Sequence, residues 1–125
     1  MKKIKTLIID DDDIFRFTLK ELILMIEQYE FEINESPNGL TGLDMARNNS
    51  YDLIIVDLKL PDMPGAEIIA NIREFDQKVP IFIVTGTPSI DSSLSMSDLN
   101  VFEYFVKPVD ENEFLNAIDS IFLTL

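Results

Sequence analysis

Residues 52–57 read DLIIVD and place four consecutive apolar residues, Leu53 to Val56, directly before an aspartate. An apolar run without alternation is typical of a strand that is buried on both faces of a parallel sheet. Further strand-like segments lie on either side of it, at residues 5–9, 31–36, 80–85 and 101–106. Segments with helical periodicity follow each strand, at residues 13–28, 38–49, 66–75, 89–99 and 110–123. Five strands that alternate with five helices predict an α/β fold, a doubly wound parallel sheet with helices on both faces.

Two of the expected helices carry more specific predictions. In the helix over residues 66–75, the apolar side is formed by Ile68, Ile69, Ile72 and Phe75. The helix over residues 89–99 contains five serines, whose hydroxyls compete for backbone groups, and has only a thin apolar stripe. We therefore expect this second helix to be the least stable element.

Length and composition narrow the class of protein. A chain of 125 residues suits one domain, which we expect to span residues 1–125. Its 23 acidic and 10 basic residues give a net charge of −13, which disfavours direct binding to nucleic acid or to anionic membranes. The absence of Cys excludes disulfides and thiol catalysis, and the absence of His removes the usual general base. No segment reads as a signal peptide or membrane span, so we expect a cytoplasmic protein.

Polar side chains follow four of the five predicted strands. They are the run Asp10 to Asp13, then Asp57, then Thr85 with Gly86 behind it, and Lys107. The carboxyl ends of parallel strands share one edge of the sheet, so these groups are expected to converge. Carboxylates and waters make a Mg²⁺ site, an aspartate can accept a phosphoryl group, and a lysine or a threonine can bind phosphoryl oxygens, while a glycine leaves room for the group to enter.

Each of these residues also has an ordinary structural interpretation. Asp12 or Asp13 is expected to cap the following helix, and Asp57 could simply end a strand. Taken alone, Thr85 is a β-former and Lys107 a surface residue. Four consecutive aspartates repel one another unless a cation holds them, and it is the joint arrangement that favours a functional site.

The chain resembles the receiver domains of two-component response regulators over about residues 4–122. The resemblance rests on motifs that occur in order and in register: Asp10-Asp11 with Arg16, DLIIVDLKLPDMPG at residues 52–65 with Asp57, Pro61 and Gly65, then Thr85, Tyr104 and Lys107-Pro108, with an interval of 22 residues from Thr85 to Lys107. It implies a flavodoxin-like sheet with strand order 2-1-3-4-5.

The resemblance also implies a role for each residue of the site. Asp57 is the phosphoacceptor and, with Asp11 and Asp10, a ligand of Mg²⁺. The backbone carbonyl of Lys59 is a further ligand. Lys107 pairs with the phosphoryl group, and its bond to Pro108 is cis. The protein is then a signalling phosphoacceptor that at most catalyses its own phosphorylation and dephosphorylation, and is not otherwise an enzyme.

Signalling follows from a coupled switch in this family. Thr85 moves toward the phosphoryl group and Tyr104 turns inward, which remodels the face formed by residues 89–99, 101–106 and 110–123. The chain has no His, so its phosphoryl donor is a histidine kinase or a histidine phosphotransfer protein. A downstream protein target binds the remodelled face, and a homodimer through that face is a further expectation.

Several positions depart from the usual family pattern. Asp13 stands where proline is frequent, and Asn100 replaces a common glycine, which a left-handed asparagine can do. Lys59 and Thr87 occupy positions that tune the lifetime of the phosphoryl group. Phe102 is expected either to add an apolar spot to the signalling face or to pack under a neighbouring side chain.

Two other functions remain as alternatives. The run LIIDDD at residues 7–12 also resembles the start of haloacid-dehalogenase-like phosphatases, in which Asp10 would be the nucleophile, Asp12 the general acid, and Thr85 and Lys107 the next two functional groups. That reading finds no later pair of aspartates and leaves Asp57 unexplained. The second alternative is a degenerate receiver that acts only as a binding module, although all five key positions are intact. The receiver itself is expected to have no output domain, or to be excised from a longer regulator or hybrid kinase. A P-loop is excluded because no GxxxxGK run is present.

Overall fold

The computed structural model describes residues 1–86 and 99–122. Its elements are, in chain order, β1 (Lys2–Ile9), α1 (Asp13–Leu24), β2 (Tyr29–Ser36), α2 (Gly39–Asn48), β3 (Leu53–Val56), α3 (Gly65–Phe75), β4 (Ile81–Thr85), β5 (Glu103–Val106) and α5 (Glu111–Phe122). The five strands are all parallel, in the order β2-β1-β3-β4-β5. This confirms the doubly wound, flavodoxin-like fold. The helix expected over residues 89–99 lies outside the described residues, apart from Leu99.

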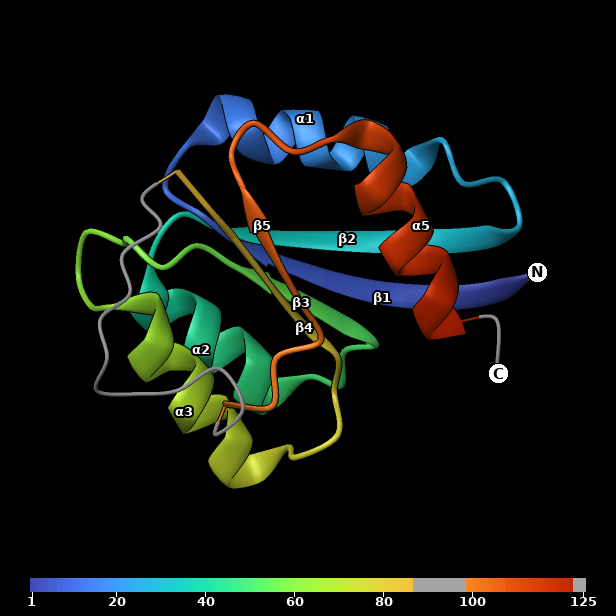
Figure 1. Cartoon of the computed structure of the whole chain (residues 1–125). Coiled ribbons are helices and arrows are strands. Elements are labelled where there is room, and N and C mark those ends of the chain that lie inside the picture. The colour runs from blue at the N-terminus through green and yellow to red at the C-terminus, as the bar shows by residue number, and fades with distance from the viewer. Residues whose placement is uncertain (87–98, 123–125) are drawn as a thin grey trace.

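The helices cover both faces of the sheet, with α1 and α5 on one side and α2 and α3 on the other (Figure 1). Strand side chains alternate between the two faces. Ile4 and Ile8 of β1 therefore join the cluster under α1 and α5, whereas Leu7 and Ile9 join the cluster under α2 and α3. All four residues of β3 are buried, as the unbroken apolar run predicted.

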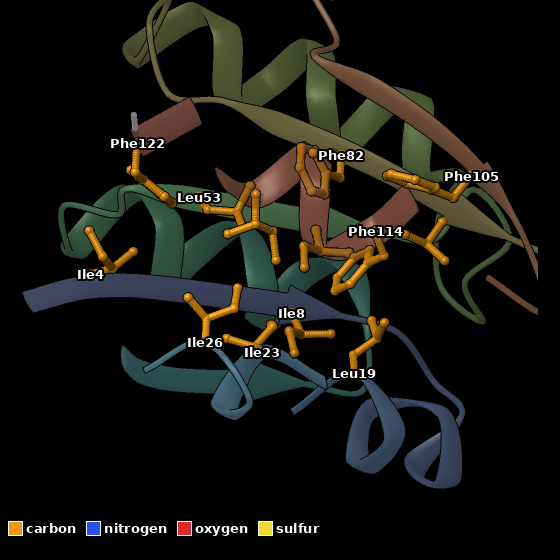
Figure 2. Close-up of a cluster of buried hydrophobic side chains, with 14 residues drawn as sticks. Ile4, Ile8, Leu19, Ile23, Ile26, Leu53, Phe82, Phe105, Phe114 and Phe122 are labelled. Atoms are coloured by element: carbon orange, nitrogen blue, oxygen red, sulfur yellow. The ribbon is translucent and has the colours of Figure 1, made fainter. Parts of the chain in front are cut away.

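Aromatic rings fill the core beneath α5 (Figure 2). Phe82 of β4, Phe105 of β5 and Phe114 of α5 meet edge to face, with ring centroids 5.5 to 6.0 Å apart. Such contacts add about 0.5–1.5 kcal/mol each to the energy of burial. They fix β5, the last strand of the sheet, against the helix that follows it.

Some expected boundaries were wrong by a few residues. β1 begins at Lys2 rather than at residue 5 because Lys2 and Lys3 pair with Tyr29 and Glu30 of β2, so that backbone pairing extends beyond the apolar run. α1 ends at Leu24 rather than at residue 28.

The expected apolar side of α3 was wrong at one position. Ile68, Ile69 and Ile72 are fully buried, but Phe75 is 41% exposed. Phe75 is the last residue of α3, and its ring lies 5.4 Å from the guanidinium of Arg47 in α2. At the end of the helix this side chain packs against a neighbouring helix surface instead of entering the core.

The turn before β5 confirms the expectation for Asn100. This residue adopts φ 52°, the left-handed conformation that asparagine tolerates. The guanidinium of Arg73 donates to the carbonyls of Leu99 at 3.0 Å and Asn100 at 2.8 Å. Arg73 thereby ties the end of α3 to this turn. Among the described helices, none is long and apolar enough to cross a membrane.

Candidate functional site

Three charged side chains converge where β1, β3 and β5 end. Asp57 continues the sheet beyond β3, and its amide donates to the carbonyl of Ile9 at 3.0 Å. The amide of Lys107 likewise donates to the carbonyl of Thr85 at 2.8 Å. These bonds extend the ladder past the strands and bring Asp10, Asp57 and Lys107 to one place. The predicted convergence at this edge is confirmed for these three residues.

Lys107 joins the two buried aspartates. Its Nζ lies 2.8 Å from Oδ2 of Asp10 and 3.1 Å from Oδ2 of Asp57. Asp10 is 2% exposed and Asp57 is 6% exposed. Burial raises the pKa of Asp10, although its hydrogen bonds from Lys107 and from the amide of Asp12 act in the opposite direction. Burial alone would lower the pKa of Lys107, but the hydrogen bonds and charges of Asp10 and Asp57 outweigh it and raise that pKa.

The acidic groups have the composition of a site for a hard cation. Asp10, Asp11 and Asp57 each offer a carboxylate oxygen, and these oxygens lie within 4.8 Å of one another. Lys107 is the one described cation in ion-pair contact with any of the three, so negative charge remains in excess. Carboxylate oxygens are ligands that Mg²⁺ prefers. Asp11 is exposed, so water can reach the cluster and complete an octahedral coordination. The three residues therefore fit Mg²⁺.

A cavity of about 440 Å³ opens beside the carboxylates. Its lining consists of Asp11, Asp12, Asp57, Lys59, Leu60, Pro61, Gly86 and Lys107. The backbone amide of Lys59 donates to Oδ1 of Asp57 at 3.1 Å, so both oxygens of Asp57 have partners. The expected role of the Lys59 carbonyl as a metal ligand stays a prediction. A Cβ on Gly86 would lie 3.7 Å from Cδ of Lys107, so the space at Gly86 would also admit a methyl group.

The loop after Asp57 is closed by a glycine. The amide of Gly65 donates to the carbonyl of Leu58 at 2.8 Å, and Lys59 forms an isolated bridge with Pro64. A Cβ on Gly65 would lie 2.1 Å from the carbonyl oxygen of Asp57 and 2.7 Å from Cα of Leu58. This contact explains physically why the motif ends in glycine.

Asp62 in the same loop has a partner that the sequence did not reveal. Its carboxylate accepts hydrogen bonds from the amides of Gly39 and Leu40, both at 2.8 Å. The bonds from Leu40 and Gly39 lower the pKa of Asp62. Asp62 thus caps the beginning of α2 together with Asn38, whose side chain accepts from the amide of Thr41. The loop that follows Asp57 is thereby fastened to the neighbouring helix.

The beginning of α1 borders the site. Asp12 caps the helix, as predicted for Asp12 or Asp13, and accepts from the amide of Phe15 at 3.1 Å. The side chain of Phe15 also borders the site, because the centroid of its ring lies 4.3 Å from Nζ of Lys107. No signal in the sequence singled out this contact, since Phe15 also continues the apolar stripe of α1.

Arg16, which the resemblance singled out, supports the end of β1. Its guanidinium donates to the carbonyl of Asp10 and to Oε1 of Glu35, the latter at 3.0 Å. Lys20 binds the other oxygen of Glu35 at 2.7 Å. The hydrogen bonds from Lys20 and Arg16 lower the pKa of Glu35. This network holds α1 against β2 beside the acidic cluster.

The expected switch residues lie on the other face of the sheet. Thr85 is fully buried, and Tyr104 is half-buried against the cluster under α2 and α3. Ile83 pairs with Tyr104, so Thr85 lies two residues further along β4. The switch remains a prediction, and Thr87 lies outside the described residues.

Phe102 is partly exposed and partly packed, and its expected place in a signalling face stays a prediction. It is 45% exposed, and its ring centroid lies 6.0 Å from that of Phe82. The ring therefore contacts the core through one part and leaves another part on the surface.

The sequence matches a known family over most of its length. The family model of the response regulator receiver domain matches residues 6–119. The cell cycle response regulator CtrA of Brucella ovis is 29% identical over 117 residues, which are 94% of this chain and 49% of that protein. The chain thus spans about half the length of the curated relatives it matches.

Solved structures give the same result. A CheY-like receiver domain protein from Methanospirillum hungatei JF-1 has a TM-score of 0.82 and 29% identity, over 96% of this chain and 93% of that one. Response regulator protein TrrA from Thermotoga maritima, in complex with Mg²⁺-BeF, has a TM-score of 0.80 and 29% identity, over 97% of this chain and 99% of that one. The bond between Lys107 and Pro108 is cis, as the resemblance implied. Because the family model matches residues 6–119 and the sheet has the expected strand order, the chain belongs to the receiver domain family of two-component response regulators.

Proposed function

We propose that Asp57 accepts a phosphoryl group from a phosphohistidine of a partner protein in a Mg²⁺-dependent reaction. The observation that carries this proposal is the setting of the Asp57 carboxylate. It is 6% exposed, lines the cavity, and is held by the ammonium of Lys107 on one oxygen and the amide of Lys59 on the other. A nucleophile that is fixed in this way, beside a cation and two further carboxylates, suits phosphoryl transfer.

The transfer replaces one bond to phosphorus by another. An oxygen of Asp57 forms a bond to phosphorus while the phosphorus–nitrogen bond of the donor breaks. The electron pair of that bond stays on the imidazole nitrogen, which takes a proton from solvent. The ammonium of Lys107, 3.1 Å from Oδ2 of Asp57, is placed to pair with an oxygen of the phosphoryl group.

Mg²⁺ would be held by Asp10, Asp11 and Asp57. When bound, the ion neutralises charge on the phosphoryl group during transfer. The excess of carboxylates over cations in the cluster supports its binding here, and the Mg²⁺-BeF complex of TrrA, at 29% identity, gives a precedent in a relative.

The donor is a histidine kinase or a histidine phosphotransfer protein, since this chain has no His. An exposed apolar face on α1 supports docking of such a partner beside the site. Its members are Ile14 at 75% exposure, Phe17 at 60%, Leu24 at 57% and, directly after the helix, Met25 at 55%. Apolar side chains that gather in this way commonly mark an interaction surface. The residue that caps this helix, Asp12, also lines the cavity.

The phosphorylated chain acts as a signal and not as an enzyme on a separate substrate. Thr85 and Tyr104 would shift together on phosphorylation and change the population of two states of the surface around β5. Val106 and Phe102 are 46% and 45% exposed there, which suits a protein target or a second copy of the chain.

The phosphatase alternative is not favoured. The carboxylate of Asp12 caps α1, which is a structural role, and the residues that line the cavity include Asp57 but not Asp10. The phosphatase alternative would also leave the position of Asp57 in the cavity unexplained.

One experiment separates these functions. The chain is incubated with a small acyl phosphate and Mg²⁺, and the mass of the intact protein is measured, with hydroxylamine to cleave an aspartyl phosphate. We expect the gain of one phosphoryl group in the wild type, none in Asp57→Asn, and a slower gain in Asp10→Asn, which weakens the metal site and the contact with Lys107 but keeps the acceptor. Labelling that survives in Asp57→Asn and disappears in Asp10→Asn would refute the proposal and support the phosphatase.

A further inference from the structure

The ammonium of Lys107 is enclosed from three directions. Asp10 and Asp57 contact it through carboxylate oxygens at 2.8 and 3.1 Å, and the ring of Phe15 lies 4.3 Å away. Only 17% of the Lys107 side chain is exposed. The aromatic ring therefore covers a side of the ammonium that no described carboxylate occupies.

We propose that Phe15 is a positioning residue for phosphoryl transfer, acting through Lys107; the inference rests on the proposed function of the site. The negative face of an aromatic ring attracts a cation, and the ring also keeps water from that side of the ammonium. Exclusion of water strengthens the attraction between Lys107 and a phosphoryl oxygen, because the local dielectric is lower.

The reaction itself makes such a restraint useful. Lysine carries its charge on a flexible four-carbon stem. When Asp57 becomes an acyl phosphate, the oxygen that bonds to phosphorus loses its negative charge and holds the ammonium less firmly. The contact with Phe15 does not depend on the charge of Asp57, so it can hold Lys107 before and after the transfer.

The role is separable from the packing of Phe15. Phe15 takes part in the helix cap through its backbone amide, which donates to Asp12, and not through its side chain. The ring also packs against the core under α1 and α5, as does the half-buried ring of Phe31 on β2. Phe31→Leu therefore makes the same chemical change in the same core without a contact to Lys107, and serves as the matched control.

The test compares Phe15→Leu, Phe15→Tyr and Phe31→Leu. Phosphorylation by a small acyl phosphate with Mg²⁺ is timed for each, so that docking of a partner protein plays no part. From the usual strength of a cation–ring contact, Phe15→Leu is expected to slow the reaction about 2- to 30-fold. Phe15→Tyr keeps the ring and is expected to retain the rate, and Phe31→Leu is expected to lower the melting temperature without changing the rate.

A spectroscopic measurement gives an independent result. In the wild type without donor, the ring current of Phe15 should shift the ε-methylene protons of Lys107 upfield, and Phe15→Leu should remove this shift while Phe15→Tyr keeps it. The proposal is overturned if the wild type has no such shift, if Phe15→Leu reacts as fast as wild type, or if Phe31→Leu slows the reaction equally. Failure of the wild type to accept phosphoryl at all would instead overturn the proposed function of Asp57.

Discussion

Gly65 is the position in the site loop where a single added carbon should do the most damage. It begins α3, and its amide closes the loop that follows Asp57 through a hydrogen bond of 2.8 Å to Leu58. We predict that Gly65→Ala destabilises the fold and impairs phosphorylation together, because the new methyl group would meet the backbone of Asp57 itself.

The size of the effect follows from the contact distances. The added Cβ would lie 2.1 Å from the carbonyl oxygen of Asp57, about 1.3 Å short of the 3.4 Å at which ordinary contact begins. Backbone cannot rotate away as a side chain can, so the loop must shift. Overpacking of this kind costs about 1–3 kcal/mol, and a weakened hydrogen bond to Leu58 adds about 0.5–1.5 kcal/mol. We expect a loss of about 1.5–4.5 kcal/mol in the free energy of unfolding.

The rate of phosphorylation of Gly65→Ala should fall by more than the loss of folded protein explains. A shift of about 1 Å in a reacting group can cost on the order of 100-fold in rate. The assay is urea unfolding for stability and timed labelling by a small acyl phosphate for the rate, under conditions where both proteins are folded. Gly86→Ala is the control for stability, since its Cβ would meet nothing closer than 3.7 Å. A Gly65→Ala protein that unfolds within about 0.5 kcal/mol of wild type would refute the reasoning, because surface changes without a clash stay within that range.

Three further predictions concern the surroundings of the site. Asp62→Ala should speed hydrogen exchange at the amides of Gly39 and Leu40 several-fold, as measured by NMR; unchanged exchange would contradict the cap. Glu35→Gln should lower stability by about 0.5 kcal/mol at neutral pH. Because Lys20 and Arg16 lower the pKa of Glu35, the wild-type advantage is complete above its ordinary pKa and disappears as pH falls through the lowered value, so a difference that is constant with pH would contradict the ion pairs. Lys59→Asn should shorten the lifetime of the phosphoryl group several-fold if the lysine shields it from water, and an unchanged dephosphorylation rate would reject that role.

The sheet and the central site could be predicted because their determinants are local. Leu53 to Val56 are buried on both faces of the sheet, and an unbroken apolar run predicts such burial directly. The residues that follow the strands converge because parallel strands end at one edge, which requires no knowledge of side-chain contacts. The positions of the strands alone were therefore enough to predict that Asp10, Asp57 and Lys107 lie together.

Contacts between distant segments could not be predicted in the same way. Asp62 binds amides 22 and 23 residues away, and Phe15 lies over Lys107 through the meeting of α1 with the end of β5. Nothing in the neighbouring sequence distinguishes these partners. The predicted burial of Phe75 was wrong for a related reason. Helical periodicity indicates the side of α3 on which a residue lies, but not where along the helix the core ends.

The burial of Asp10 and Asp57 is best explained by function, because it opposes the stability of the fold. They are the two buried acidic residues among the described part of a chain with 23 acids, and the strand order places them side by side. Burial of two like charges beside one lysine costs more than leaving them in water, as the raised pKa of Asp10 indicates. A fold that only needed stability would place apolar residues there. Their position in one cluster with exposed Asp11 is expected if a cation and a phosphoryl group complete the site.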